Sequence, residues 1–148
     1  MRCTKNLFCR YLVPRTGAIV VCMVATLIGC AEKFDHDPAV AAAKAEEFAR
    51  VAFVNRDVQK SYDLLAVGTR RYVSLEKLKE VITRLHPKGY PSAVQAGGSE
   101  AMPGEKAVYV FLAGESAGER FYYRLTLEGT AKAGYRVLQF DRASGPRK

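Results

Sequence analysis

The hydrophobic positions of this chain follow three successive patterns. An unbroken apolar run extends from Gly17 to Gly29, apolar side chains then recur every three or four residues between residues 38 and 85, and they alternate with polar ones after Tyr90. A spacing of three or four residues is typical of helices that bury one face, and alternation is typical of half-buried strands. The pattern therefore predicts an α+β domain in which helices precede an antiparallel sheet.

The first predicted helix begins at Pro38, with Asp37 as its N-cap. Proline is well tolerated at the first helical position because its missing N–H would be unpaired there in any case. Asn55-Arg56-Asp57 is expected to end this helix. One face carries small and aromatic residues and another carries charges: Ala41, Ala45, Phe48 and Ala52 against Lys44, Glu47 and Arg50.

Two further helices are expected, one capped by Asp57 and ended by Gly68, the other capped by Ser74 and ended by His86. Residues 69–73 between them are predicted to be extended. The apolar positions at helical spacing are Val58, Tyr62 and Leu65 in the first of these helices, and Leu75, Leu78, Ile82 and Leu85 in the second.

Four strands are expected at residues 92–100, 107–112, 120–128 and 135–141, joined by glycine-containing connections that suit hairpins. Gly97-Gly98 is expected to form a bulge that bends the sheet. In the third strand, Phe121, Tyr123, Leu125 and Leu127 face one way, and Tyr122, Arg124, Thr126 and Glu128 the other. The predicted fold has two to three helices packed on a curved antiparallel sheet of about four strands, with one sheet face partly wet.

Residues 1–29 have the organisation of a secretory signal. Four basic residues and no acidic one precede the apolar run, which at 13 residues is shorter than the roughly 20 that a membrane-spanning helix needs. The run ends in Leu27-Ile28-Gly29-Cys30, which resembles the lipobox of bacterial lipoproteins. The resemblance implies cleavage between Gly29 and Cys30, lipidation of Cys30, a lipidated tether at residues 30–37 and a domain at residues 38–148.

The resemblance also implies a protein anchored in the cell envelope. Ala31, in place of an aspartate, favours the periplasmic face of the outer membrane over the inner membrane. The alternatives are an uncleaved anchor helix and an ordinary signal peptide. Cys3, Cys9 and Cys22 lie in the leader, so its removal leaves only the acylated Cys30, which excludes a disulfide, a thiolate metal site and a cysteine nucleophile.

Removal of the leader changes the charge of the chain. Four of the 23 basic residues and none of the 15 acidic ones lie within residues 1–29, so 19 basic and 15 acidic residues remain and the net charge falls from +8 to +4. The remaining basic residues are interleaved with acids, apart from a basic carboxy-terminal end. This distribution does not indicate a nucleic-acid partner.

The arrangement of residues 38–141 resembles the NTF2-like superfamily. The likeness rests on an Ala-rich helix ending in Phe48-Ala49-Arg50-Val51-Ala52, the break at residues 55–57, and Ser61-Tyr62-Asp63-Leu64-Leu65. It implies a cone in which a helix lies across a curved sheet. A cystatin-like domain is the alternative. In both folds, the apolar face of a helix packs on a bent sheet.

Relatives of this kind can hold catalytic groups inside the cone. The candidates here are Asp63, His86 and the tyrosines at positions 62, 72, 109 and 123. His86 has the most suitable pKa for acid–base chemistry, but its place at a helix end predicts a capping or surface imidazolium. Tyr62 is expected to be a core aromatic with a satisfied hydroxyl, and Asp63 to be solvated. Asp35-His36-Asp37 stands alone in the tether, so no metal or other cofactor is expected.

Two functions from different classes follow. The first is a non-catalytic, membrane-tethered module that binds an envelope protein or a small apolar ligand, for which Tyr122, Arg124 and Arg136 form a candidate surface because tyrosine and arginine anchor many interfaces. The second is an isomerase- or dehydratase-type enzyme acting on a small hydrophobic substrate in the cone. A cone filled by Phe48, Phe111 and Leu125 would argue against the second.

Overall fold

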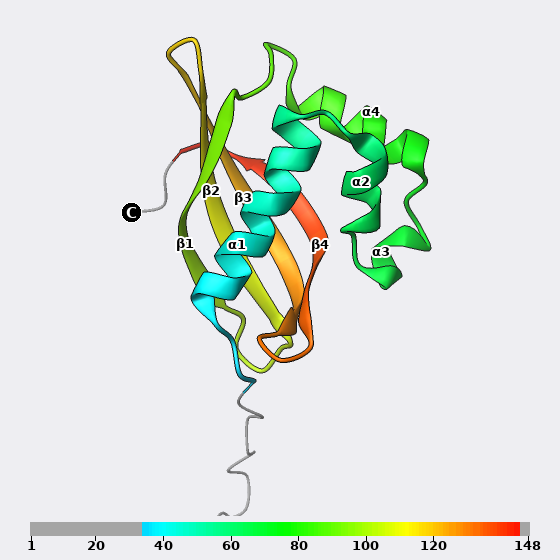
Figure 1. Ribbon diagram of the computed structural model, residues 1–148, viewed down its shortest axis with the longest axis vertical. Helices are drawn as coiled ribbons and strands as arrows, with labels where there is room; N and C mark the ends of the chain where they lie inside the picture. The colour runs from blue at the N-terminus through cyan, green and yellow to red at the C-terminus, as the bar shows by residue number, and fades with distance from the viewer. Residues whose placement is uncertain (1–33, 146–148) are drawn as a thin grey trace, which may run out of the picture. The chain divides into compact units, whose positions relative to one another are not determined.

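A computed structural model describes residues 34–145, in which helices precede a four-stranded antiparallel sheet, as the sequence predicts (Figure 1). The strand order is β1-β2-β3-β4. The helical segments are α1 (Pro38–Ala49), its π-helical continuation η1 (Arg50–Val54), α2 (Val58–Asp63), α3 (Val67–Arg70) and α4 (Leu75–Leu85). The strands are β1 (Ala93–Ala101), β2 (Ala107–Ser116), β3 (Glu119–Thr130) and β4 (Gly134–Ala143). The expected leader and the Gly29–Cys30 cleavage site lie outside the described residues.

Helix α1 lies across one face of the sheet, while α2, α3 and α4 lie beyond the β4 edge (Figure 1). The core forms between α1 with η1 and the inward side chains of the sheet. As expected, the residues of β3 that face inward are Phe121, Tyr123, Leu125 and Leu127. Burial of each such side chain contributes roughly 1.5–3 kcal/mol to the stability of the domain.

The predicted helix caps are confirmed. The Asp37 carboxylate accepts hydrogen bonds from the amides of Ala39 and Val40 at 2.8 and 3.2 Å. Asp57 accepts from the Lys60 amide at 3.0 Å, and Ser74 accepts from the Lys77 amide at 3.1 Å. The predicted break at residues 55–57 is confirmed by Arg56, whose φ of 58° is left-handed and ends the helix.

The expectation that Gly68 ends the second helix is wrong. Helix α2 already ends at Asp63, because the next residues join the edge of the sheet: the Ala66 amide donates to the Val137 carbonyl at 2.7 Å, and the Val137 amide donates to the Leu64 carbonyl at 3.1 Å. Gly68 lies inside the short helix α3, so residues 69–73 are not extended. The sheet edge overrides the local turn signal.

The sheet bends at two irregularities. The predicted bulge is confirmed, because the pairing of β1 with β2 shifts between Ala96 and Gly98. A second shift, opposite Thr126 and Leu127 of β3, lies in β4. Where the bend begins, a side chain of α1 binds the edge strand β1: the Ala96 amide donates a hydrogen bond to the Glu46 carboxylate at 2.6 Å.

Within the described residues, no helix covers the other face of the sheet, and the outward residues of its strands stand in register. Phe111 pairs with Gly98 on β1 and with Arg124 on β3. Phe111 therefore does not contribute to the filling of the interior, because it shares the outward side with Arg124. Within residues 34–145, no helix combines the length and the apolar character needed to cross a membrane.

Candidate functional site

The first candidate site is a histidine–tyrosine pair inside the domain. His86 is 4% exposed and Tyr123 1%. The His86 Nδ1 lies 2.7 Å from the Ile82 carbonyl, and its Nε2 lies 2.8 Å from the Tyr123 hydroxyl. A carbonyl oxygen only accepts, so Nδ1 carries the proton and Nε2 accepts from the tyrosine O–H. Both ring nitrogens are satisfied when the imidazole is neutral.

The structure confirms His86 as the C-cap of α4 but contradicts a surface position. Burial lowers the pKa of His86, the Ile82 carbonyl opposes this, and the Arg142 cation lowers it further. Burial also raises the pKa of Tyr123, which keeps its hydroxyl protonated as a donor. The expected capping imidazolium is therefore replaced by a neutral imidazole, because desolvation outweighs the helix dipole.

Aromatic rings fill the space around His86. Tyr90 stacks on it with a centroid distance of 4.5 Å, and Phe53 lies at 5.0 Å. Arg142 closes the remaining side, since it donates to the Leu85 carbonyl at 2.9 Å and lies 4.7 Å above the Phe121 ring. The arrangement holds the α4 end against β3 and β4 and encloses the imidazole, which is 4% exposed.

The other predicted catalytic candidates do not converge on His86. The Tyr62 hydroxyl donates to the Arg70 carbonyl at 3.2 Å, as expected for a satisfied core aromatic. Tyr72 is 89% exposed, and Asp63 is exposed at the end of α2, as expected. Tyr109 lies on the outward face of β2.

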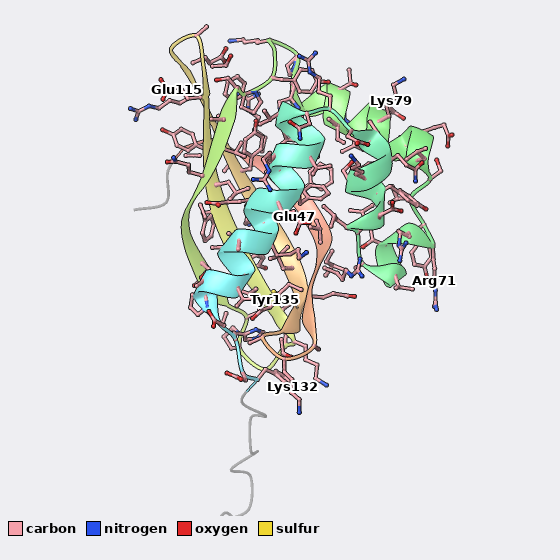
Figure 2. All side chains as sticks on the ribbon, in the orientation of Figure 1. Glu47, Arg71, Lys79, Glu115, Lys132 and Tyr135 are labelled. Atoms are coloured by element: carbon pink, nitrogen blue, oxygen red, sulfur yellow. The ribbon has the colours of Figure 1, made fainter. Side chains whose placement is uncertain are left out.

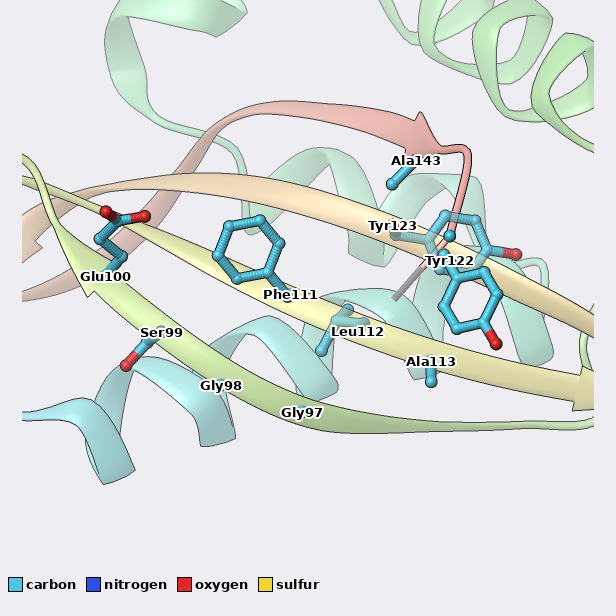
Figure 3. Close-up of a pocket in the computed structure, with 11 residues that line it drawn as sticks. Gly97, Gly98, Ser99, Glu100, Phe111, Leu112, Ala113, Tyr122, Tyr123 and Ala143 are labelled. Carbon is cyan, nitrogen blue, oxygen red and sulfur yellow. The ribbon is translucent and has the colours of Figure 1, made fainter. Parts of the chain in front are cut away.

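The second candidate site is a depression on the helix-free face of the sheet, here called the outer hollow. It consists of two adjoining cavities of about 440 and 790 Å³ that share Glu100, Phe111, Ala143 and Gly145. Tyr122 lines the first cavity, and Tyr109 and Arg124 line the second. Figure 3 shows the first cavity with the helices behind the strands. These volumes lie in the range of small-ligand sites.

Small residues beside large rings create the outer hollow. Gly98 is the β1 partner of Phe111, while Ala113 and Ala143 flank Tyr122 on either side. A Cβ added at Gly98 would meet no atom within 4 Å. The surface beside the Phe111 ring is recessed because the neighbouring strand carries no side chain at Gly98.

A polar cluster borders the aromatic part. The Arg124 guanidinium lies 3.4 Å from the Asp141 carboxylate and 5.4 Å from the Tyr109 ring centre. The Gln139 side-chain amide donates to the same carboxylate at 3.0 Å. Both members of the ion pair are about half exposed, so it contributes little stability, about 0–1 kcal/mol, and its groups remain accessible to a ligand.

The structure separates the three residues of the predicted binding surface. Tyr122 and Arg124 lie together at the outer hollow. Arg136 does not join them, since it stands opposite Glu128 and donates to the Asp63 carbonyl at 2.7 Å. The sequence-based prediction did not assign Tyr109 and Phe111 to this surface, although the alternation of residues 107–112 places both opposite the buried Val108, Val110 and Leu112.

Within residues 34–145, no three His, Cys, Asp or Glu side chains are arranged to hold a metal ion. No protein-family model, no curated protein and no solved structure matches this chain. The class that the fold and the site define is an α+β domain with one helix-covered sheet face and one open, hollowed face.

Proposed function

We propose that this chain is a lipid-anchored protein of the cell envelope whose domain binds an envelope protein or a small apolar ligand without catalysing a reaction. The leader and the lipobox resemblance at residues 27–30 support the anchor. The observation that carries the binding role is the outer hollow, a ligand-sized depression in which Phe111, Tyr122 and Tyr109 lie beside a half-exposed ion pair.

The chemistry of the outer hollow supports a ligand that combines apolar and polar groups. Aromatic rings offer apolar area, and Arg124 and Asp141 offer one charge of each sign. The outward positions of the sheet include Glu100, Glu115, Glu128 and Asp141 against Arg120, Arg124 and Arg136. This balance does not favour a polyanion such as a nucleic acid. The proposed ligand has an apolar group that covers the rings and a polar group that reaches the ion pair.

We further propose that the domain is NTF2-like and that it lies on the periplasmic face of the outer membrane. The long helix across a bent sheet supports the first part, although a cystatin-like domain shares this arrangement. An enzyme working inside the cone has less support, because His86 is enclosed by Phe53, Tyr90 and Tyr123.

A photo-crosslinking amino acid at Tyr122 tests the binding role in intact envelopes. Irradiation is expected to give a discrete adduct, seen as one shifted band or one mass increment. The same amino acid at Lys79, which is exposed on α4 (Figure 2), is expected to give none. A second substitution, Gly98→Phe, is expected to suppress the adduct because the new ring fills the space beside Phe111.

Three results would contradict the proposed binding role: no adduct at Tyr122, the same adducts at both positions, or an adduct that Gly98→Phe leaves unchanged. The thermal midpoint of Gly98→Phe serves as a folding control. It is expected to stay near that of the parent protein, because φ at Gly98 is not left-handed and an added Cβ there would meet no atom within 4 Å.

A further inference from the structure

The first four described residues, Phe34–Asp37, are attached to the domain and are here called the strap. The His36 Nε2 lies 3.2 Å from the Glu105 carbonyl, and its Nδ1 lies 3.3 Å from the Tyr135 hydroxyl. The Asp37 amide donates to the same hydroxyl at 3.1 Å. Because the Glu105 carbonyl only accepts, Nε2 carries the proton, and Tyr135 donates to Nδ1 while it accepts from Asp37.

The strap connects two turns that are distant in sequence. Glu105 lies in the β1–β2 turn, residues 102–106. The amide of Ala131 in the β3–β4 turn, residues 131–133, donates to the Asp35 carbonyl at 3.1 Å. The Lys106 ammonium lies 5.2 Å above the Phe34 ring. The two turns and the strap therefore form one end of the domain, here called the turn end, where Figure 2 shows Lys132.

The strap shortens the link to the expected anchor. The sequence predicts a tether over residues 30–37, but the contacts of the strap leave only four peptide steps between Cys30 and Phe34. At roughly 3.3–3.6 Å per residue, that link spans at most about 14 Å. Strands β2 and β3, each of ten or more residues, extend about 30 Å or more from the turn end. The link is thus about half as long as the domain.

We propose that the turn end is a membrane-facing surface: the strap holds the two turns against the phospholipid bilayer and orients the domain with its strands pointing away from it. This inference rests on the proposed lipidation of Cys30. The exposed ammonium groups of Lys106 and Lys132 can lie beside lipid phosphates. The length of the link, more than this charge, sets the orientation. The outer hollow then opens sideways, toward neighbours anchored in the same membrane.

A pair of single-cysteine variants tests the orientation. Once Cys30 is acylated, the mature chain has no other thiol, so Lys132→Cys at the turn end and Glu115→Cys at the opposite end (Figure 2) can each carry one fluorophore. The lipidated proteins are incorporated into phosphatidylcholine–phosphatidylglycerol vesicles with nitroxide-labelled headgroups. Loss of fluorescence is expected at position 132 and none at position 115. Equal loss at both positions, or more at position 115, would overturn the orientation.

The strap is tested by Tyr135→Phe, which removes the hydroxyl that holds His36 and Asp37 but keeps the ring. The difference between positions 132 and 115 is expected to shrink because the link lengthens. Tyr62→Phe, the same atomic change on α2, is the matched control and should preserve the difference. A Tyr135→Phe protein that keeps the full difference would contradict the role of the strap.

The proposed lipid anchor and the orientation fail in distinguishable ways. A protein that does not float with vesicles at all contradicts the lipid anchor, and the orientation with it. A protein that floats but shows equal fluorescence loss at both positions contradicts the orientation alone.

Discussion

Replacement of His86 by leucine is expected to lower the free energy of unfolding by about 3 kcal/mol. Leucine keeps most of the volume between the surrounding rings, but it leaves the Tyr123 hydroxyl and the Ile82 carbonyl without their partner. Each unpaired buried group costs about 1–3 kcal/mol. Urea denaturation followed by circular dichroism measures the change, and a loss below about 1 kcal/mol would show that the two hydrogen bonds do not hold α4 to the sheet.

The same residue is expected to make stability depend on pH. Burial places the folded-state pKa of His86 below its unfolded value of 6.5. The unfolded chain therefore binds more protons in this range. The contribution of His86 is fully present above about pH 6.5 and is lost as the pH falls below it, with a slope of up to about 1.4 kcal/mol per pH unit. His86→Leu should remove this part of the slope, and an unchanged profile would contradict a buried neutral imidazole.

A double-mutant cycle separates the hydrogen bond from the packing. Tyr123→Phe removes only the hydroxyl and should cost about 1–2 kcal/mol, because the His86 Nε2 then lacks its donor. In the His86→Leu background the same change should cost much less. Tyr62→Phe, whose hydroxyl is part-buried and binds the Arg70 carbonyl at 3.2 Å, is the matched control with an expected loss of about 1 kcal/mol or less. Additive losses at positions 86 and 123 would contradict the proposed pairing.

The second large effect is expected for Gly129→Ala at the end of β3. Gly129 has a φ of 125°, and a Cβ there would collide with the carbonyl oxygen of Gly134 across the hairpin. Left-handed strain of about 1–2 kcal/mol and overpacking of about 1–3 kcal/mol both apply, so a loss of about 3–4 kcal/mol is expected. Tyr135, the register partner of Gly129, also holds the strap.

Two other glycines separate these costs. Gly134→Ala adds only the strain, because its φ is 81° and a Cβ would meet no atom within 4 Å, and should cost about 1–2 kcal/mol. Gly68→Ala in α3 adds neither and should stabilise by up to about 1 kcal/mol. Thermal denaturation of the three variants gives the order. A Gly129→Ala protein as stable as Gly134→Ala would contradict the close approach across the hairpin.

The fold could be predicted from the sequence where local chemistry agrees with packing. Asp37, Asp57 and Ser74 cap helices because their side chains reach the first-turn amides, which requires no knowledge of the rest of the chain. The inward side of β3 follows from simple alternation. Gly68 was misplaced because the end of α2 is set by pairing of residues 64–66 with Val137, a contact more than 70 residues away in sequence.

The candidate site was predictable only in part. Tyr122 and Arg124 are at the outer hollow because alternation puts both on the open face. Arg136 shares that side but lies away from them along the strand, since register decides which outward residues meet. His86 was predicted at a helix end, which is correct, but burial depends on the rings of Phe53, Tyr90 and Tyr123 from three other segments. Such convergence is a property of tertiary packing.

The central claim, a domain anchored by lipid at Cys30, is tested most directly by the intact mass of the protein purified from bacterial membranes. The expected species begins at Cys30, lacks residues 1–29 and carries a diacylglycerol, while Cys30→Ser accumulates as the full, unmodified chain. A wild-type protein that retains residues 1–29, or that begins at Cys30 or later without lipid, would contradict the account.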